Sequence, residues 1–163
     1  MKLCGTPNTR SRAQSSSRRC AKSRATTATA AADEYDALFG GVGKPEIYLF
    51  GSWYLSGFLN EKPLAALRGD LAERGLSRDE SMTETEDHFA CVCEVMRYLI
   101  AGDDVEVANL TQQQKFFSAH VQSWAPALCE AIAAHPKARF YAALAGFTAA
   151  FISVETQGFD LMV

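Results

Sequence analysis

The features that the sequence lacks already exclude several classes of protein. Its 163 residues contain no run of about 18 apolar residues, so we expect no segment that inserts into a membrane. It has only three histidines, none followed four residues later by another, and no cysteine pair with zinc spacing, which argues against a metal site. It also lacks a Gly-x-Ser-x-Gly elbow and a Gly-Lys-Ser/Thr phosphate loop. We therefore expect a soluble protein that is not an enzyme and holds no cofactor.

The cysteines do not form a disulfide framework. There are five, an odd number, and Cys91 and Cys93 lie two residues apart in a helical pattern. Residues two apart on a helix point to different faces, so this pair suits neither a mutual disulfide nor a shared metal. A reducing compartment, the cytoplasm, is the simpler interpretation.

Acidic residues are absent from the first 32 positions. That segment holds seven of the 16 Lys/Arg, so residues 33–163 carry nine basic against 19 acidic side chains, a formal charge of -10. A nucleic-acid partner is not expected, because phosphate binding requires a basic surface on the folded part. Residues 1–32 are rich in Ser, Thr, Ala and Arg, and we interpret them as a disordered basic arm before a domain at 33–163.

Within the arm, residues 17–22 resemble the paired-arginine core of a twin-arginine export signal. Such a signal needs an apolar segment after the arginines, and residues 23–29 are Ser, Arg, Ala and Thr. We therefore favour a solvated arm over a signal peptide. An organelle transit peptide also fits the composition.

Helical periodicity dominates the rest of the chain. We expect helices at about 46–59, at 60–75 with Asn60 as N-cap, from 86 to Gly102, from Thr111 to 135 with a break or kink at Pro126, and from 140 to a frayed end at Gly158. The buried stripe of the second of these is Leu64, Leu67 and Leu71. No segment alternates over strand length, so the sequence predicts an all-α fold, a single helical bundle.

The tripeptide Glu86-Asp87-His88 opens the most regular amphipathic helix. Carboxylates are favoured at a helix N-terminus, and Thr83-x-x-Glu86 reads as a capping box. The imidazole of His88 is not explained in this way, because a cation is disfavoured there. A helical wheel predicts that Asp87 faces solvent or a groove, and that His88 lies between the two faces, where it could meet the core edge or a ligand.

Trp53 and Tyr54 are adjacent, so they cannot both face one core, and we expect at least one to line a groove or an interface. His120 lies four residues before Trp124 in a helical pattern, which is typical of a structural histidine. His135 precedes a proline at a helix end, where it favours a C-terminal cap.

A set of short motifs occurs in order from about residue 33 to the end of the chain. They are Tyr35-Asp36-Ala37-Leu38-Phe39, Pro45-Glu46, Gly51-Ser52-Trp53-Tyr54, Glu86-Asp87-His88 with Glu94-Val95-Met96, His120-Val121-Gln122-Ser123-Trp124, and Phe140-Tyr141 with Glu155. In this combination the chain resembles the TorD/DmsD/NarJ family of cytoplasmic molybdoenzyme maturation chaperones. The fit is closest to members associated with formate dehydrogenase.

The resemblance implies a helical bundle that binds the twin-arginine leader of a molybdoenzyme subunit, delays its export and assists insertion of the molybdenum cofactor. The residues that match the family's signal-peptide-binding positions are Ser52, Trp53, Tyr54, Glu86, Asp87 and His88. A carboxylate can pair with a guanidinium fork and aromatic side chains can receive the apolar part of a leader, which agrees with this implication.

Two other readings stay open at this stage. A helical enzyme could use Asp87 and His88 as an acid/base pair, or the chain could be a generic helical interaction module. The family's members have several helices before the Tyr35 region, where this chain has its arm, a difference that a misplaced start or a shifted reading frame would produce. We expect such a bundle to lack N-terminal helices, and a homodimer by helix exchange would complete it.

Overall fold

The fold is all-α, as predicted. A computed structural model describes residues 27–40, 43–79 and 81–161, and the first 26 residues of the basic arm, with the export-like motif, lie outside the described part. The helices are α1 (Ala28–Leu38), α2 (Gly51–Ser56), α3 (Lys62–Glu73), α4 (Phe89–Ala101), α5 (Leu110–Phe117), a π-helical turn η1 (Ser118–Gln122), α6 (Ala125–Ala134) and α7 (Phe140–Asp160). The described residues contain no strand, only one isolated bridge between Phe50 and His88.

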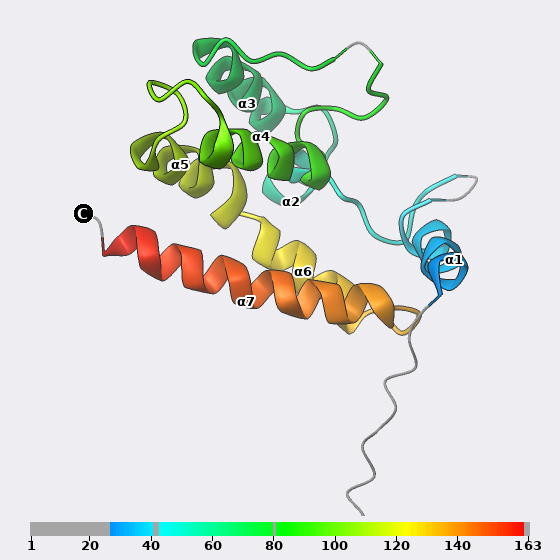
Figure 1. The fold of residues 1–163 in the computed structure, drawn as a ribbon. Helices are drawn as coiled ribbons and strands as arrows, with labels where there is room; N and C mark the ends of the chain where they lie inside the picture. The colour runs from blue at the N-terminus through cyan, green and yellow to red at the C-terminus, as the bar shows by residue number, and fades with distance from the viewer. Residues whose placement is uncertain (1–26, 41–42, 80, 162–163) are drawn as a thin grey trace, which may run out of the picture.

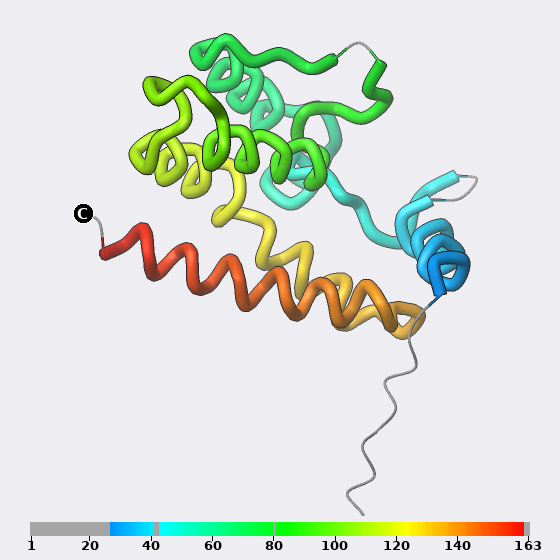
Figure 2. The backbone as a smooth tube through the Cα atoms, viewed as in Figure 1, coloured from blue at the N-terminus to red at the C-terminus, as the bar shows by residue number. Residues whose placement is uncertain are grey.

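Figure 1 shows two groups of helices. Helices α6 and α7 form the most extensive helix pair, and α2 to α5 lie together on one side of it. The tube in Figure 2 follows η1 from one group to the other, directly into α6. Four fully buried side chains from three helices belong to the core between the groups: Val92 and Leu99 of α4, Phe116 of α5 and Leu128 of α6.

Helix α1 is attached to the start of α7. The carboxylate of Glu34 accepts hydrogen bonds from the backbone N–H groups of Arg139 (2.8 Å), Phe140 (3.1 Å) and Tyr141 (2.9 Å), so one side chain caps the N-terminus of a distant helix. Helix α1 begins at Ala28, capped by Thr27, and so its first turns lie within the segment that we assigned to the arm. Helix propensity of the alanines outweighs their lack of large apolar side chains.

The helix expected at 46–59 is wrong in extent. Only Gly51–Ser56 is helical, and Gly57 ends it with a φ of 79°. The residues before α2 are extended because their backbone pairs with a distant segment, as described below. The next helix, α3, buries Leu64, Leu67 and Leu71 as predicted, but its N-cap is Glu61, while Asn60 has a φ of 58°.

The segment from Thr111 to 135 also divides. Asn109 caps α5 by accepting a hydrogen bond from the Gln112 N–H (3.1 Å), and the chain then passes through η1 to a break at Trp124. Pro126 stands in the first turn of α6, where proline is tolerated, so the break precedes it. His135 is the C-cap residue of α6, as expected. Helix α7 continues past Gly158 to Asp160.

Among the described residues, no helix combines the length and the apolar character needed to cross a membrane.

Candidate functional site

Two short segments, far apart in sequence, pair through their backbones at the centre of the predicted site. The N–H of Phe89 donates to the Leu49 carbonyl (2.8 Å), and the N–H of Gly51 donates to the Asp87 carbonyl (2.9 Å). This antiparallel contact joins the start of α2 to the start of α4. It therefore fixes the tripeptide 86–88 against the segment that contains Ser52, Trp53 and Tyr54.

Asp87 is buried, contrary to the prediction that it faces solvent or a groove. It is 3% exposed. One carboxylate oxygen accepts from the Ser52 N–H (2.9 Å) and the other from the Thr85 hydroxyl (2.6 Å). The N-cap residue of α2 is Phe50, whose side chain has no hydrogen-bond acceptor. Asp87, 35 residues after Ser52, supplies the acceptor for the first turn of α2 instead. The helical wheel failed because Asp87 precedes α4, which begins at Phe89.

Gly51 and Ser52 are buried beneath this contact. A Cβ on Gly51 would lie 3.0 Å from the Trp124 ring, so a larger residue would require the indole or the start of α2 to shift. The indole N–H donates to the His120 carbonyl (2.6 Å). The side chain of His120 lies 2.6 Å from Asp70, which agrees with its predicted structural role. A void of about 10 Å³ separates these groups, so the space around Ser52 is closed to any peptide.

His88 caps α4. Its Nδ1 accepts a hydrogen bond from the Ala90 N–H (3.2 Å), which requires a neutral ring. From the sequence, His88 was left unexplained because only the imidazolium cation was considered, whereas the neutral ring accepts a hydrogen bond at the helix N-terminus. Burial lowers the pKa of His88, and this effect outweighs the nearby carboxylates of Glu84 and Asp87, which raise it.

Glu86 points to a different place. Its carboxylate accepts from Arg68 Nε (2.9 Å), and Arg68 Nη2 lies at the same distance from the same oxygen, while Arg78 Nε lies 3.8 Å from the other. Burial alone would raise the pKa of Glu86, but the hydrogen bond from Arg68 and the charges of both arginines lower it. Glu86 thus binds guanidinium groups of its own chain.

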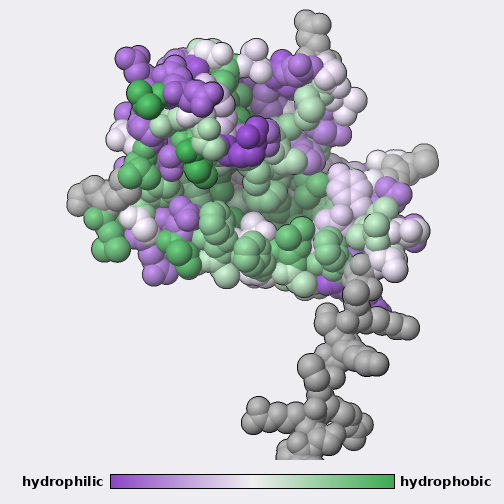
Figure 3. Space-filling view, in the orientation of Figure 1, coloured by the Kyte–Doolittle hydropathy of each residue, from purple (hydrophilic) through white to green (hydrophobic). Residues whose placement is uncertain are grey.

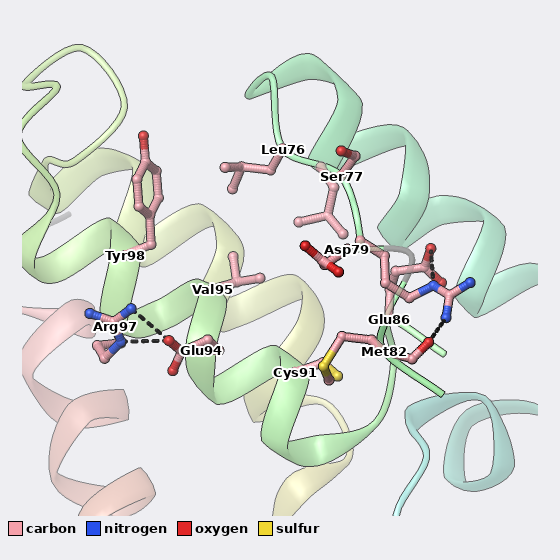
Figure 4. Close-up of a pocket in the computed structure, with 12 residues that line it drawn as sticks. Leu76, Ser77, Asp79, Met82, Glu86, Cys91, Glu94, Val95, Arg97 and Tyr98 are labelled. Carbon is pink, nitrogen blue, oxygen red and sulfur yellow. Dashed lines mark hydrogen bonds and ion pairs between the residues drawn. The ribbon is translucent and has the colours of Figure 1, made fainter. Parts of the chain in front are cut away.

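Glu86 lies on the wall of the α3–α4 cavity, which has a volume of about 390 Å³. Figure 4 shows α4 on one side, with Val95 and Tyr98, and the segment that follows α3 on the other, with Leu76 and Ser77. Cys91 and Met82 line the same space. The exposed surface of this cavity is mainly apolar, but five charged residues also line it: Arg78, Asp79, Glu86, Glu94 and Arg97.

His88 lies on a second space, the α1–α7 cavity, of about 250 Å³. Side chains of α1, α4, α6 and α7 line it, among them Tyr35, Phe89, Ile132 and Tyr141. Figure 3 shows hydrophobic surface around a hollow directly above the side chains of α7. The lining is almost wholly apolar, which suits an apolar segment of a partner.

Trp53 and Tyr54 diverge, as their adjacency predicts. Tyr54 stacks on Trp124 with ring centroids 5.8 Å apart, and burial raises its pKa to about 12. The ring centroids of Trp53 and Tyr48 lie 4.1 Å apart, and Lys44 Nζ lies 5.7 Å from the centroid of the Trp53 ring. Both side chains are half-buried, but only Tyr54 packs against the hydrophobic core.

The six predicted site residues therefore share one backbone junction but not one groove. Asp87 and Ser52 face the small void, His88 the α1–α7 cavity and Glu86 the α3–α4 cavity. Asp87 and His88 do not converge on a common space, and each already caps a helix, which disfavours the acid/base reading. Within the described ranges, no three His, Cys, Asp or Glu side chains are grouped as a metal would require.

Sequence reasoning missed Arg68 and Thr85, which hold the two carboxylates. Thr85 precedes Asp87 by two residues, a spacing typical of a local side-chain hydrogen bond. Arg68 is 18 residues from Glu86, and no local signal indicates that contact.

A model of the family described as "Nitrate reductase delta subunit" matches residues 7–130. Among curated proteins, the chain is similar to "Chaperone protein TorD" of Vibrio cholerae, with 28% identity over 113 residues, 66% of this chain and 51% of that protein. It is also similar to "Chaperone protein TorD" of Aliivibrio fischeri, with 28% identity over 134 residues, 77% of this chain and 62% of that protein. The chain thus spans roughly half the length of the Vibrio relative. No solved structure matches it.

Proposed function

This chain belongs to the nitrate reductase delta subunit family, and from that premise we propose that it is a maturation chaperone for a molybdoenzyme. The family resemblance found in the sequence is thereby confirmed. The ligand that we propose is the twin-arginine leader of the client's precursor, with formate dehydrogenase as the client and the cytoplasm as the place. We propose a binding role without catalysis, because the groups that an acid/base mechanism would need are engaged in helix caps.

The observation that carries the proposal is the pair of cavities on either side of the 86–88 tripeptide. The α1–α7 cavity, with His88 on its wall, is apolar and fits the apolar segment of a leader. The α3–α4 cavity, with Glu86 on its wall, offers a carboxylate to a guanidinium. The acidic balance of residues 33–163 adds long-range attraction for a basic peptide.

The contact of Arg68 with Glu86 indicates how an arginine of the leader would bind. The Glu86 side chain is 13% exposed, while that of Arg68 is 52% exposed, so Arg68 approaches the carboxylate from the solvent side. A leader guanidinium that displaces Arg68 would gain the same two donors on one carboxylate. We infer that Arg68 occupies this position in the free protein and competes with the leader.

Asp87 has a different role in this proposal. A guanidinium cannot reach its carboxylate without breaking the bonds from Ser52 and Thr85. We propose that Asp87 is a positioning residue, which holds the α2 segment against the tripeptide and thereby sets the orientation of Glu86 and His88. Trp53 and Tyr54 then belong to the support of the site, with Trp53 at its edge.

Calorimetric titration with a synthetic twin-arginine leader, and with its Lys-Lys variant, tests this function. We expect binding that weakens for the Lys variant and with added salt. Arg68→Ala should tighten binding because it removes the competitor, and Glu86→Gln should weaken it. The matched control is Glu73→Gln, an exposed carboxylate on the same helix as Arg68.

Two results would contradict the proposal. Equal and negligible affinity for both peptides would remove the leader as ligand and leave a generic interaction module. Tight binding that Arg68→Ala and Glu86→Gln leave unchanged would retain the leader but exclude Glu86 as its contact.

A further inference from the structure

The first turn of α4 separates the two large cavities. Ala90 lines the α1–α7 cavity, and the next residue, Cys91, lines the α3–α4 cavity, where Figure 4 shows it near Glu86. Adjacent residues of a helix diverge by about 100°, so the cavities open on different faces of α4. Glu86 and His88 repeat this division just before the helix begins. A peptide that uses both cavities must therefore cross the start of α4.

The α1–α7 cavity is suited to a bulky apolar group. Its volume is about 250 Å³, larger than the apolar cavity of about 150 Å³ that binds benzene in an engineered protein. The rings of Tyr35, Phe39 and Tyr141, which line it, lie with their centroids 5.1 to 6.0 Å apart, and can offer an aromatic guest further edge-to-face contacts. The Thr148 hydroxyl already donates to the Leu144 carbonyl (2.9 Å), so its proton is not available to a guest. A side chain that enters this cavity must be apolar, and it can be as large as phenylalanine.

The width of α4 sets the distance between the two contacts. A helix with its side chains is about 10–12 Å across. An extended peptide rises about 3.3 Å per residue, so it covers this width in roughly three or four residues. Side chains of an extended peptide alternate between its two faces, and only residues an even number of positions apart point to the same side. A separation of about four residues satisfies both conditions.

We propose that the leader lies extended across the start of α4, with an arginine at Glu86 and a bulky apolar residue, about four positions further on, in the α1–α7 cavity. This order is that of a twin-arginine signal, in which the apolar segment follows the arginines. The inference rests on the proposed function and adds to it the spacing of the two contacts. Ala145 limits the size of the apolar residue, because it lines the cavity, is only 4% exposed, and any larger side chain at this position would fill the space.

A series of synthetic peptides tests the spacing by calorimetric titration. Each peptide contains two arginines and one phenylalanine, separated by a glycine–serine spacer whose length increases stepwise from none, and a peptide with alanine instead of phenylalanine is the reference. We expect the tightest binding when phenylalanine is about the third or fourth residue after the second arginine, since either arginine can contact Glu86. The reference should bind about tenfold more weakly, because it buries no aromatic ring.

The dependence on spacing should be steep on one side and shallow on the other. Phenylalanine directly after the arginines should bind no better than the alanine reference, because the peptide is then too short to cross α4. Spacers beyond the best length should weaken binding by only about threefold for each doubling, because the entropy of closing a flexible loop grows slowly with its length.

Ala145→Leu tests the apolar contact from the side of the protein. It should weaken binding of the best peptide by about threefold or more and leave the alanine reference unchanged, because it fills space that only phenylalanine uses. The matched control is Ala150→Leu, at an exposed position of the same helix, which should change neither affinity. Circular dichroism verifies that both variants keep their helical content, and the peptide series on the parent chain does not depend on either.

The outcomes separate this inference from the proposed function. Equal affinity at every spacing, or equal affinity with and without phenylalanine, would overturn the spacing of the two contacts and leave the leader as ligand. An unchanged affinity of the best peptide for a folded Ala145→Leu chain would exclude the α1–α7 cavity as the place of the phenylalanine. Absence of binding to every peptide of the series would overturn the proposed function together with this inference.

Discussion

Replacement of Asp87 by alanine separates a positioning role from a direct contact with the ligand. The substitution removes an ionised acceptor from two hydrogen bonds, at 2.9 Å to the Ser52 N–H and 2.6 Å to the Thr85 hydroxyl. Hydrogen bonds to charged groups contribute about 1.5–3 kcal/mol each, and partial access of water to the vacated space reduces the sum. We expect Asp87→Ala to lower the free energy of unfolding by about 2–4 kcal/mol.

Asparagine at the same position refines the test. Its oxygen can accept from the Ser52 N–H while its amide donates to the Thr85 hydroxyl, so Asp87→Asn should cost only about 1 kcal/mol. Urea unfolding followed by circular dichroism measures both variants. Asp103→Ala is the control, because Asp103 is exposed and its loss should change stability by less than about 0.5 kcal/mol. If Asp87→Ala were as stable as the parent chain but lost leader binding, the positioning role would be refuted.

Three further changes have defined outcomes. Gly51→Ala should destabilise the chain by about 1–3 kcal/mol, because the new methyl group would lie 3.0 Å from the Trp124 ring. Gly69→Ala, on α3, should instead stabilise the chain by roughly 0.5–1 kcal/mol, because its methyl group would meet no other atom. Thermal unfolding of both variants and the parent chain measures the two effects. Burial alone would raise the pKa of Glu34, but three backbone hydrogen bonds outweigh burial and lower the pKa below 4.5. The stability that Glu34 contributes is therefore present above pH 4.5 and is lost as the pH falls through the folded-state pKa. Glu34→Gln should make the free energy of unfolding less dependent on pH in the acid range, and an unchanged dependence would exclude a role for Glu34 in capping α7. Burial lowers the pKa of His88 below 6.5, so the stability that its helix cap contributes is present above pH 6.5 and declines as the pH falls towards the folded-state pKa. His88→Asn, which caps a helix without titrating, should remove this part of the pH dependence of the free energy of unfolding between about pH 7 and 5. The same pH dependence in both proteins would exclude His88 as its source.

Local patterns predicted some elements of this fold. The buried stripe of α3 and the C-cap at His135 follow from periodicity and from the conformational limits of proline, which act over a few residues, whereas the break expected at Pro126 lies before it, at Trp124. The structural role of His120 was predictable in the same way, from its spacing to Trp124.

The site was less predictable because its contacts are long-range. The segment before α2 is extended since its backbone pairs with Asp87 and Phe89, and no local propensity indicates such a partner. The same pairing turns Asp87 inward, to serve a helix start 35 residues away. Glu86 lines the α3–α4 cavity, and the arginine that holds it comes from the neighbouring helix α3, which no local pattern indicates. For His88 the error lay in the assumed protonation state, since a neutral imidazole is a good acceptor.

We propose that one leader peptide occupies both cavities beside the 86–88 tripeptide. Heteronuclear NMR with isotope-labelled protein tests it directly, by mapping which backbone amides shift when an unlabelled twin-arginine leader is added. We expect the amide signals of residues that line both cavities, those around Glu86 and those around His88, to shift. Both sets of shifts should follow the same dependence on peptide concentration. Shifts confined to other surfaces, or the absence of any shift at the start of α4, would contradict it.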